Sequence, residues 1–469
     1  MALAFGYYIF SFIIGLISPF WGLVGFTCSL LLRFQDHYPQ ITSIKPFTLL
    51  LFGMLLSCII NKDKLSKLKW KQDKLILYLL LLSMFGLLIM SPSTLPGETY
   101  LYLCSISLYY FASRILQTPA QFIALFFCMG LSVTYLGYLA IEDINTFGLK
   151  SQYIDPRSNR WQGIGYYENS NEFGQLMITT VPFLLACILI RKSTILSAAS
   201  IALIGLLLYV MVKCESRTVM VTLAMMFVGT FMLRGKGNLA KKAVIGGVMS
   251  VLMLSVLTFM PGPLQERMGT ILDAGNDESF QGRTRAWGYG FDMVSWYPVT
   301  GVGKGQWLEY HGLASHNSYV EVMAETGLPG IFLYLWTILL CLKQFKPIMS
   351  NANPNAPPEK HHSVFNENVN TDEYLMNDLY SDDDKDKNID PNNCDDITVK
   401  EITNTERTVA IAVLITFVGW LLYIFLGNQG FSVWTYFYLG LCCALANILP
   451  SENKKDETLN LFGETNNEH

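Results

Sequence analysis

Residues 75–91 read LILYLLLLSMFGLLIMS, an apolar run without a charged side chain. A helix of about 17–25 such residues is long enough to cross about 30 Å of hydrocarbon. Because the bilayer core offers no hydrogen-bond partners to the backbone, a segment that crosses it must be helical. Similar runs recur along the chain of 469 residues, which is 51% hydrophobic and only 15% charged. The sequence therefore predicts an all-α fold, a polytopic transmembrane helical bundle.

We predict about 12 spans. The first apolar run, residues 3–32, is too long for one untilted helix and has Pro19 in its middle. It forms either one broken, tilted span or two short ones, and we count it as one. It lacks the basic region and cleavage site of a signal peptide, so we expect it to be retained. The other predicted spans are residues 46–60, 75–91, 98–113, 120–140, 173–190, 195–213, 218–233, 243–260, 327–342, 408–426 and 431–449.

Lysine and arginine in the short loops indicate the orientation, because cytoplasmic loops carry an excess of both. Residues 61–74 contain six lysines, and the basic residues at 191–192 and 234–242 fall on the same side of the predicted bundle. That side is predicted to be the cytoplasm, and it also receives both termini. The loops 141–171 and 261–326 and the tight turn at 214–217 then lie on the opposite side.

Residues 346–406 differ in kind from the rest of the chain. They are rich in Asn and Asp and show almost no apolar periodicity. Such a composition buries too little surface to offset the entropy of ordering the chain. We therefore predict a disordered, acidic cytoplasmic insertion, which is either a spacer or a partner-binding segment, and a similar tail at 451–469. The ten cysteines lie singly apart from 442–443, mostly in apolar runs, and indicate no disulfide framework or zinc site.

The loop 261–326 is the longest polar segment between predicted spans. Its acidic residues outnumber its basic ones, and adjacent positive charge is concentrated at Arg283 and Arg285. Planar guanidinium groups suit two-point binding of phosphate oxygens. Trp287 belongs to an aromatic run that prefers the membrane–water interface, which would hold these arginines at headgroup depth. The alternative is that both arginines are interfacial anchors or ion-pair partners.

Arg217 and His316 are two further candidates. Arg217 lies in a short turn between two apolar runs, where a charge usually has a partner or a role. Its alternative role is to reach the interface and pair with Glu215. His316 precedes a predicted helix that Ser315 or Asn317 can cap. A helix N-terminus favours a neutral imidazole, which can accept a proton from a hydroxyl near neutral pH, although a lone histidine is more often an ordinary hydrogen-bonding residue.

Three weaker patterns surround these candidates. Glu321 and Glu325 are four residues apart, so they share a helix face and either orient an arginine or meet water. The glycines at 301, 303 and 305 predict a turn that permits close backbone approach rather than a nucleotide-binding fingerprint. The loop 141–171 combines Arg160 and Asn171 with aromatic residues, which suits sugar binding and equally an ordinary interfacial loop.

Four segments, in this order, resemble the bacterial O-antigen ligase superfamily, which includes O-antigen polymerases and protein O-oligosaccharyltransferases. They are RWQGIGYYENSN at 160–171; ESRT at 215–218; Gly282-Arg283 with Trp287, followed by Pro298-x-x-Gly301-Val-Gly303; and HNSYVE at 316–321 with Glu325, Gly327 and Gly330. The last segment is the most specific. The spacing of Pro19, Trp21 and Gly22 more weakly resembles the subgroup found with exosortase-linked exopolysaccharide systems.

The resemblance implies a metal-independent glycosyltransferase without a cofactor, with the glycosyltransferase C-like fold of lipid-linked-sugar enzymes. The implied donor is a glycan on undecaprenyl diphosphate, and the acceptor is a hydroxyl on lipid A-core, a growing glycan or a protein. The implied location is the bacterial inner membrane, with the active site facing the periplasm. Arg217 and Arg283 match the arginines that bind the diphosphate, and His316 matches the histidine that activates the acceptor. The further substrate-binding candidates are Arg285, Arg160, Asn171, Trp287, Asn317, Glu321 and Glu325.

The predicted organisation has a catalytic core at 141–345 between transmembrane helices at 1–140 and 407–450, with the insertion at 346–406. The shared motifs do not separate ligase, polymerase and protein-glycosylating members. Two other classes stay as alternatives. A polysaccharide transporter should carry polar residues inside its spans, and most spans here are clean. An assembly scaffold would use the acidic insertion as its contact. No feature indicates nucleic acid as a partner.

Overall fold

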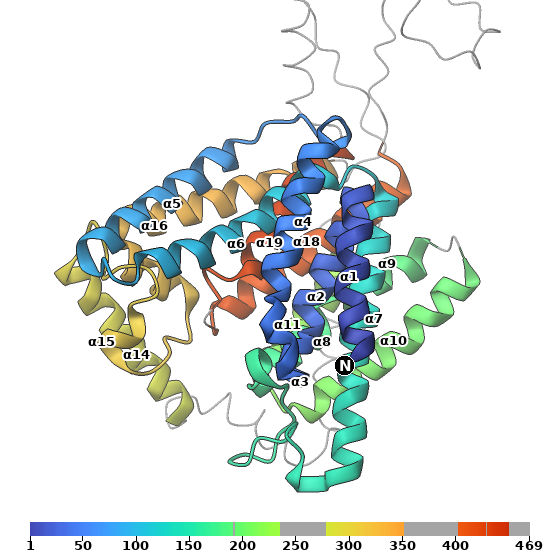
Figure 1. Cartoon of the computed structure of the whole chain (residues 1–469), viewed down its shortest axis with the longest axis horizontal. Helices are drawn as coiled ribbons and strands as arrows, with labels where there is room; N and C mark the ends of the chain where they lie inside the picture. Colours follow the sequence, from blue (N-terminus) through green and yellow to red (C-terminus); the bar gives the residue numbers. More distant parts are fainter. Residues whose placement is uncertain (191–192, 235–277, 351–401, 428, 450–469) are drawn as a thin grey trace, which may run out of the picture.

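The computed structural model describes residues 1–190, 193–234, 278–350, 402–427 and 429–449. The predicted span 243–260, the first part of the loop 261–326, most of the insertion 346–406 and the tail 451–469 lie outside the described residues. The described part is built from helices (Figure 1). Its only β interaction is an isolated bridge between Ile154 and Trp161. The predicted all-α class is confirmed.

The bundle brings together helices from all parts of the described chain. In chain order they are α1 (Ala2–Ile17), α2 (Pro19–Leu32), α3 (Phe34–His37), α4 (Pro46–Ile60), α5 (Lys71–Met90), α6 (Leu95–Ile115), α7 (Pro119–Phe147), α8 (Ser170–Thr179), α9 (Val181–Ile190), α10 (Thr194–Lys213), α11 (Arg217–Arg234), α14 (Glu278–Trp296), α15 (Trp307–His311), α16 (Ser318–Lys343), α17 (Lys346–Ser350), α18 (Asn404–Ile424) and α19 (Val433–Ala444). Short 3₁₀ turns include η1 (Pro39–Ile44), η2 (Lys62–Lys64) and η4 (Gly165–Tyr167).

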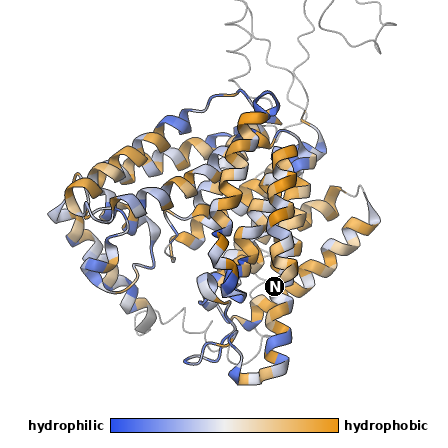
Figure 2. Cartoon of the chain, in the orientation of Figure 1, coloured by the Kyte–Doolittle hydropathy of each residue, from blue (hydrophilic) through white to orange (hydrophobic). Residues whose placement is uncertain are grey.

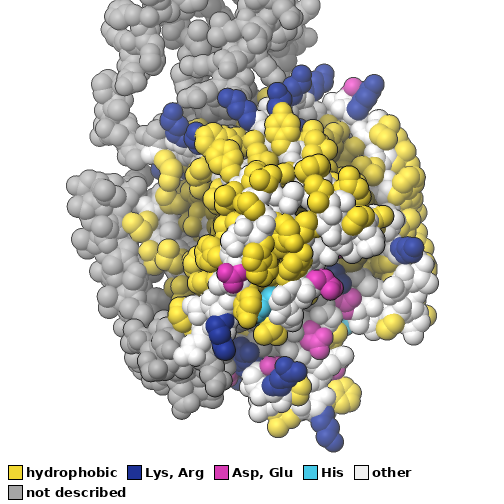
Figure 3. All heavy atoms as spheres, turned by 90° about the vertical axis from the view of Figure 1, so that its left-hand side faces the viewer, with side chains coloured by type: hydrophobic (Ala, Val, Ile, Leu, Met, Phe, Trp, Pro, Cys, Tyr) yellow, Lys and Arg dark blue, Asp and Glu magenta, His cyan; other side chains and the backbone are white. Residues whose placement is uncertain are grey.

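The helices carry the apolar surface of a membrane protein. Among the described residues, six helical segments are long and apolar enough to cross a bilayer, and four shorter helices are also apolar. Figure 2 shows the apolar residues along the helices and the hydrophilic ones near their ends. On the face drawn in Figure 3, a broad hydrophobic band separates lysine and arginine side chains at one edge from a mixed charged region at the other. The chain is a multi-pass membrane protein, whereas the count of twelve spans stays a prediction.

The first apolar run forms a hairpin. α1 ends at Ile17, Ser18 is extended, and Pro19 opens α2, a position where the missing N–H of proline costs little. The hydroxyl of Tyr7 donates a hydrogen bond to the carbonyl of Gly25 over 2.7 Å, which shows that the two helices run antiparallel. The prediction of a single span was wrong, because the proline starts a second helix after a turn instead of kinking one helix.

The hairpin also changes the predicted position of the amino terminus. Its turn lies beside the lysine-rich loop, since the side chain of Asn61 donates to the carbonyl of Leu16 over 3.3 Å. Met1 therefore lies at the opposite end of the bundle from residues 61–74 (Figure 1). The prediction that the amino terminus and the lysine-rich loop share one side was wrong. The last helix does end beside this loop, because Ser66 donates to Asn447 over 2.7 Å.

The opposite end, which we call the loop end, consists of residues 33–45, 148–169, 214–217 and 297–317. Hydrogen bonds of backbone and side-chain groups hold these loops together. Trp161 N donates to the carbonyl of Lys213 over 3.2 Å, and Tyr166 N donates to Asp36 over 3.3 Å. The Tyr166 hydroxyl donates over 2.8 Å to the side-chain oxygen of Gln429. The backbone N–H of Gln429 donates in turn to the hydroxyl of Ser318. The segments predicted to lie opposite the lysines are thus together at one end.

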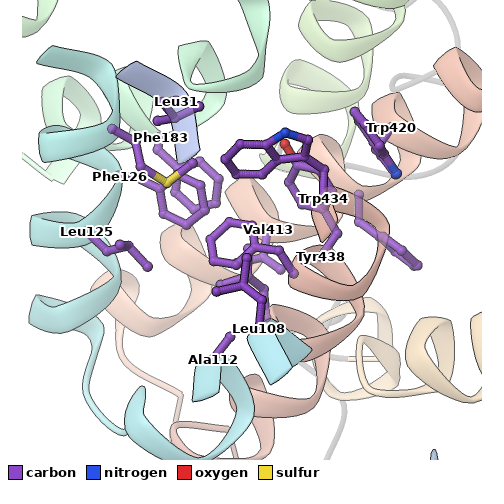
Figure 4. Close-up of a cluster of buried hydrophobic side chains, with 14 of the residues drawn as sticks. Leu31, Leu108, Ala112, Leu125, Phe126, Phe183, Val413, Trp420, Trp434 and Tyr438 are labelled. Carbon is purple, nitrogen blue, oxygen red and sulfur yellow. The ribbon is translucent and has the colours of Figure 1, made fainter. Parts of the chain in front are cut away.

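The core joins the beginning and the end of the chain. Figure 4 shows side chains of α2, α6, α7 and α9 meeting those of α18 and α19, among them Phe126, Phe183 and Trp434. The hydroxyl of Tyr436 donates to Tyr102 over 2.6 Å. Helices of the predicted N-terminal and C-terminal groups therefore share one core, and this core supports the loop end.

The helix that leads away from the loop end, α16, is broken at one residue. At Gly327 the backbone leaves the helical region with φ +70° and ψ −174°. The loop 298–303 fills the gap: Val302 N donates to the carbonyl of Ala324 over 2.9 Å, and Gly303 N to that of Glu325 over 3.1 Å. The carbonyls of Ala324 and Glu325 are therefore hydrogen-bonded despite the break, because the loop backbone supplies the donors.

Candidate functional site

His316 is held between two fixed elements. On one side, the indole of Trp287 in α14 donates to the carbonyl of Ser315 over 3.1 Å. On the other, Asn317 caps α16, since its side-chain oxygen accepts from Tyr319 N at 3.0 Å and Val320 N at 3.2 Å. The predicted cap is confirmed for Asn317. His316 itself has φ +48°, in the left-handed region that few non-glycine residues adopt. The short segment 315–317 therefore has one defined path, which sets where the imidazole lies.

The electrostatics of His316 favour the neutral imidazole. Burial lowers the pKa of this histidine from its ordinary value, and the positive charge of Arg283 lowers this pKa further. Arg283 lies on α14 one helical turn before Trp287, so the two side chains lie on the same face of α14. A neutral imidazole beside a fixed guanidinium can accept a proton while the cation binds an anion.

The segment with Arg217 joins the loop end through its preceding residue. The hydroxyl of Ser216 donates to the side-chain oxygen of Asn171 over 2.6 Å. Asn171 lies in the first turn of α8, and Arg217 begins α11. Glu215, two residues before Arg217, has φ +48° and turns the chain sharply between α10 and α11. Arg217 thus directly follows Ser216, whose hydrogen bond to Asn171 joins two of the four sequence segments.

Arg160 and Trp161 dock the loop 148–169 onto the same turn. Arg160 donates from Nε to Ser158 over 3.0 Å, and its charge acts on Cys214. The ring of Trp161 meets that of Tyr209 edge-on, with centroids 6.0 Å apart. Arg160 is therefore near the start of α11, on the side where the chain turns.

Glu325 has a partner in the protein. Its carboxylate accepts a hydrogen bond from Trp307 N over 3.1 Å, and the residue is only 2% exposed. The glycines before Trp307 make this possible. A Cβ on Gly301 would lie 2.3 Å from the backbone carbon of Glu325, and Gly301 has φ +63°. The predicted close backbone approach of the glycine turn is confirmed, and Glu325 anchors it.

Glu321 and Arg285 lie in different surroundings. One carboxylate oxygen of Glu321 is buried and has no hydrogen-bond partner among the described residues. The charge of Lys304, which pairs with Glu98 over 2.6 Å, also acts on Glu321. Arg285 is exposed and donates to the carbonyl of Gln281 over 3.4 Å. Being two residues after Arg283 on the same helix, it does not share the face of Arg283.

Four residues outside the predicted set come close to this region. Tyr423 of α18 is within electrostatic reach of Arg283 and of Glu172 in α8. Glu172, Gln175 and Gln429 line a recess with Tyr423. A carboxylate next to an apolar span, as at Glu172, is a sequence signal for a functional site. Nothing in the sequence pattern indicates that residues near 423–429 return to residues 166–175.

The site residues thus share one end of the bundle. Arg217 follows the Ser216–Asn171 contact, Glu172 is next to Asn171, and Arg283 acts on both Tyr423 and His316. Residues 201–335 match the family model described as O-antigen ligase. This match covers less than a third of the chain, and over that segment the chain is similar to the O-antigen ligase family. This match spans Arg217, Arg283 and His316 but leaves out Arg160 and Asn171.

The matched family comprises membrane glycosyltransferases of the O-antigen ligase and polymerase type, and the match supports that type of protein for this chain. The expected resemblance is confirmed over three of the four segments. The comparison with curated proteins finds no match. The matched region ends at residue 335, inside α16, so it includes the break at Gly327 and the loop 298–303 but not the end of the helix.

Proposed function

We propose that the protein transfers an oligo- or polysaccharide from undecaprenyl diphosphate to a hydroxyl acceptor on the periplasmic side of the bacterial inner membrane. The observation that carries this proposal is the place of His316 at the loop end, half-buried between α14 and α16, where burial and the positive charge of Arg283 lower its pKa. The family match supports it, because it covers Arg217, Arg283 and His316 together.

The chemistry follows from these groups. The acceptor oxygen attacks the anomeric carbon of the donor sugar, and the bond from that carbon to the diphosphate oxygen breaks. His316 takes the proton of the acceptor hydroxyl, and undecaprenyl diphosphate departs with its extra negative charge. Arg217 and Arg283 stabilise that charge, which is where fixed cations accelerate a reaction most. We propose that no metal ion is needed for this step.

The other predicted residues take supporting roles in the proposal. Asn171 and Asn317 fix the backbone beside Arg217 and His316, and Trp287 fixes the path of residue 315. Glu325 holds the glycine turn. Arg160 and Glu321 line the approach of the substrate, and Arg285 meets solvent or headgroups.

The test is transfer by the purified protein in lipid vesicles with an undecaprenyl diphosphate-linked glycan. Arg217→Ala, Arg283→Ala and His316→Ala should each lower the rate by about 100-fold or more, with unchanged insertion and melting temperature. Wild-type rates in all three variants would refute the site. Excess chelator should leave the wild-type rate unchanged, and loss of activity with recovery on adding a divalent ion would refute metal independence.

The acceptor is decided by the same assay. Lipid A-core, a glycan repeat and a pilin-like protein are offered in turn, and the one that becomes glycosylated separates ligase, polymerase and protein-glycosylating activity. Uptake of the lipid-linked glycan into vesicles without any product would instead support a transporter.

A further inference from the structure

The loop end contains a groove that none of the proposed catalytic or substrate-binding residues lines. It lies between α3 with the following Tyr38, the last turns of α7, and residues 152–153 of the loop 148–169. Its volume of about 320 Å³ is within the range of about 300–1,000 Å³ that ligand pockets have, and it opens to solvent. We call it the α7 groove and define it by Tyr38, Tyr135, Glu142, Asp143, Gln152 and Tyr153.

The α7 groove lies where α7 leaves the hydrocarbon. α7 begins beside the lysine-rich loop, because the side chain of Gln117 donates to the carbonyl of Lys64 over 2.7 Å. Its 29 residues make a helix about 44 Å long, against about 30 Å of bilayer core. The last turns of α7 therefore project beyond the core, and Figure 1 shows them extending past the amino terminus. A hydrophilic ligand can reach the groove there from water.

Aromatic rings form much of the surface of the α7 groove. Tyr38 and Tyr135 are exposed, whereas Tyr153 is buried. The hydroxyl of Ser151 accepts a hydrogen bond from Tyr153 N over 3.0 Å and donates one to Asp143 over 2.5 Å. This hydroxyl fixes the loop 148–169 against α7, so the groove is formed before a ligand binds. A preformed site lowers the entropy cost of binding.

The polar groups of the α7 groove are mainly hydrogen-bond acceptors. They include the carboxylates of Glu142 and Asp143 and the amide oxygen of Gln152, and both Glu142 and Gln152 are exposed. Among the described residues, no lysine or arginine lines the groove. Burial lowers the pKa of His37 from its ordinary value, although Asp36 acts in the opposite direction. The lining is therefore negative at neutral pH.

This lining favours a neutral glycan over other ligands. A phosphate or an acidic sugar would be repelled by the two carboxylates. A lipid chain would take the carboxylates out of water without giving them donors. The hydroxyls of a neutral sugar donate to carboxylate and amide oxygens, and hydrogen bonds to a charged acceptor are stronger than neutral ones. The C–H faces of the sugar pack on the exposed tyrosine rings.

The α7 groove is connected to the proposed site through α8. The ring of Tyr153 packs near that of Phe173, with centroids 6.4 Å apart. Phe173 is two residues after Asn171, whose side chain accepts from Ser216 directly before Arg217. A glycan joined to a diphosphate at Arg217 has further sugars beyond the reacting one. The groove lies at the same end of the bundle, where it can receive them.

We propose that the α7 groove binds neutral sugars of the glycan that lie away from the reacting bond, with hydroxyls donating to Glu142 and Asp143 and ring faces packed on Tyr38 and Tyr135. This inference rests on the proposed function, and it adds to it a second contact that recognises the length of the glycan. The glycan belongs either to the lipid-linked donor or to a glycan acceptor, and the experiment separates the two sources.

The test compares Tyr135→Ala and Glu142→Gln with wild type, using the full chain in lipid vesicles. Tyr138→Ala is the matched control for the ring, because Tyr138 is 50% exposed on the same helix, against 43% for Tyr135, but does not line the groove. Glu168→Gln is the control for the carboxylate, because Glu168 is exposed in the same loop end and is also outside the lining.

Three probes are used. The first is the free glycan of several repeat units, released from its lipid, whose binding is measured by titration and by NMR saturation transfer from the aromatic protons of the protein. The second is undecaprenyl diphosphate that carries either one sugar or several repeat units, for which KM is measured with each acceptor. The third is a lysine-rich peptide, which matches the charge of the groove but not its rings.

We expect wild type to bind the free glycan and to transfer saturation to it. Tyr135→Ala and Glu142→Gln should each weaken this binding by about fivefold, as for the loss of one good contact. For a donor glycan, the KM of the long donor should rise by a similar factor while that of the single-sugar donor stays unchanged. For an acceptor glycan, the acceptor KM should rise instead. Tyr138→Ala and Glu168→Gln should match wild type throughout.

Three results would overturn the inference. The first is wild-type affinity for the free glycan in both groove variants. The second is an equal rise in KM for the single-sugar donor, which would place the reacting sugar in the groove. The third is binding of the lysine-rich peptide that the groove variants lose while glycan binding stays, which would assign the groove to a basic protein segment.

Failure of the inference and failure of the proposed function are distinguishable, because binding of the free glycan is measured without turnover. A protein that bound the glycan through the α7 groove but transferred nothing would refute the proposed transfer and still support the groove. A protein that transferred the glycan with wild-type binding and KM values in both groove variants would refute the groove alone.

Discussion

The hydroxyl of Ser216 donates to the side-chain oxygen of Asn171 over 2.6 Å and thereby joins the start of α8 to the turn before α11. The two residues are 45 positions apart in the chain. Since Arg217 follows Ser216 directly, this one bond limits how far the first turn of α11 can move relative to α8. It is a short contact between groups that the sequence shows only as two separate motifs.

Removing this bond should reduce transfer without removing a charge. Ser216→Ala and Asn171→Ala both lose the hydrogen bond that joins these residues, which is worth about 1 kcal/mol, or about a fivefold change in an equilibrium. Ser216→Ala also loses the bond that its hydroxyl accepts from Val219 N over 3.4 Å. We expect a similar loss in kcat/KM for each. The double variant should lose little more than Ser216→Ala alone, because Asn171→Ala breaks a bond that Ser216→Ala already lacks. Additive losses measured in the same vesicle assay would show that the two side chains act separately.

The two arginines of α14 should differ. Arg283→Ala removes the charge that acts on His316 and should lower transfer by about 100-fold. Arg285→Ala is the matched control on the same helix, because its exposed side chain faces away from Arg283. We expect less than a threefold change for it, in line with an exposed charge. Equal losses for both, measured at matched protein levels, would contradict the assignment to Arg283 alone.

The pH dependence should report the shifted pKa of His316. The base form is the neutral imidazole, so transfer falls as the pH drops through the pKa of this residue. Since burial and Arg283 lower that pKa, activity should persist below the ordinary histidine value of about 6.5. In Arg283→Gln, the residual activity should fall at a higher pH than in wild type, because one cause of the lowered pKa is gone. If the acid limb of the pH profile lies at the same pH in Arg283→Gln and in wild type, the charge of Arg283 does not act on the pKa of His316.

The glycine turn should be sensitive to a single methyl group. Gly301→Ala forces a Cβ to 2.3 Å from the backbone of Glu325 at a residue with φ +63°, so protein stability should fall by more than the 1–2 kcal/mol of the φ cost alone. Gly312→Ala is the control, because Gly312 has φ +74° but nothing lies within 4 Å of an added Cβ. The thermal midpoint in detergent should therefore drop clearly more for Gly301→Ala. Equal drops would mean that the backbone angle alone matters.

Deleting residues 351–400 tests the acidic insertion, which lies outside the described residues. If it is a spacer, transfer should stay within about twofold of wild type, as for surface changes away from a site. A short flexible linker replaces the deleted residues so that the ends of α17 and α18 stay joined. Loss of transfer with normal insertion and stability would instead support a scaffold role for this segment.

The sequence predicts local features well where one residue decides them. The apolar runs give α4, α5 and α10 with nearly the observed bounds, and Asn317 caps its helix as expected. The residues after Pro19 were mispredicted, because a proline in a long apolar run fits a kinked helix and a hairpin equally well. The deciding contact is Tyr7 with Gly25, which no periodicity reports.

The candidate site shows the same limit. His316, Arg217 and Arg283 stand out as charges or a histidine next to apolar runs, so their neighbourhood at one end follows from the predicted orientation. The partner of Glu325, Trp307 N, is a backbone group and leaves no trace in the side-chain pattern. The meeting of Glu172 with Tyr423 depends on how α8 and α18 pack, and their sequence separation hides it.

The interruption of α16 at Gly327 has a consequence for biogenesis. A helix that stops and restarts exposes carbonyls that hydrocarbon cannot satisfy, and here Val302 and Gly303 satisfy them from outside the helix. The helix is therefore incomplete until the preceding loop 298–303 has folded against it. Folding of the loop and completion of the helix become a single event, so a defect in either one would leave the other unfinished.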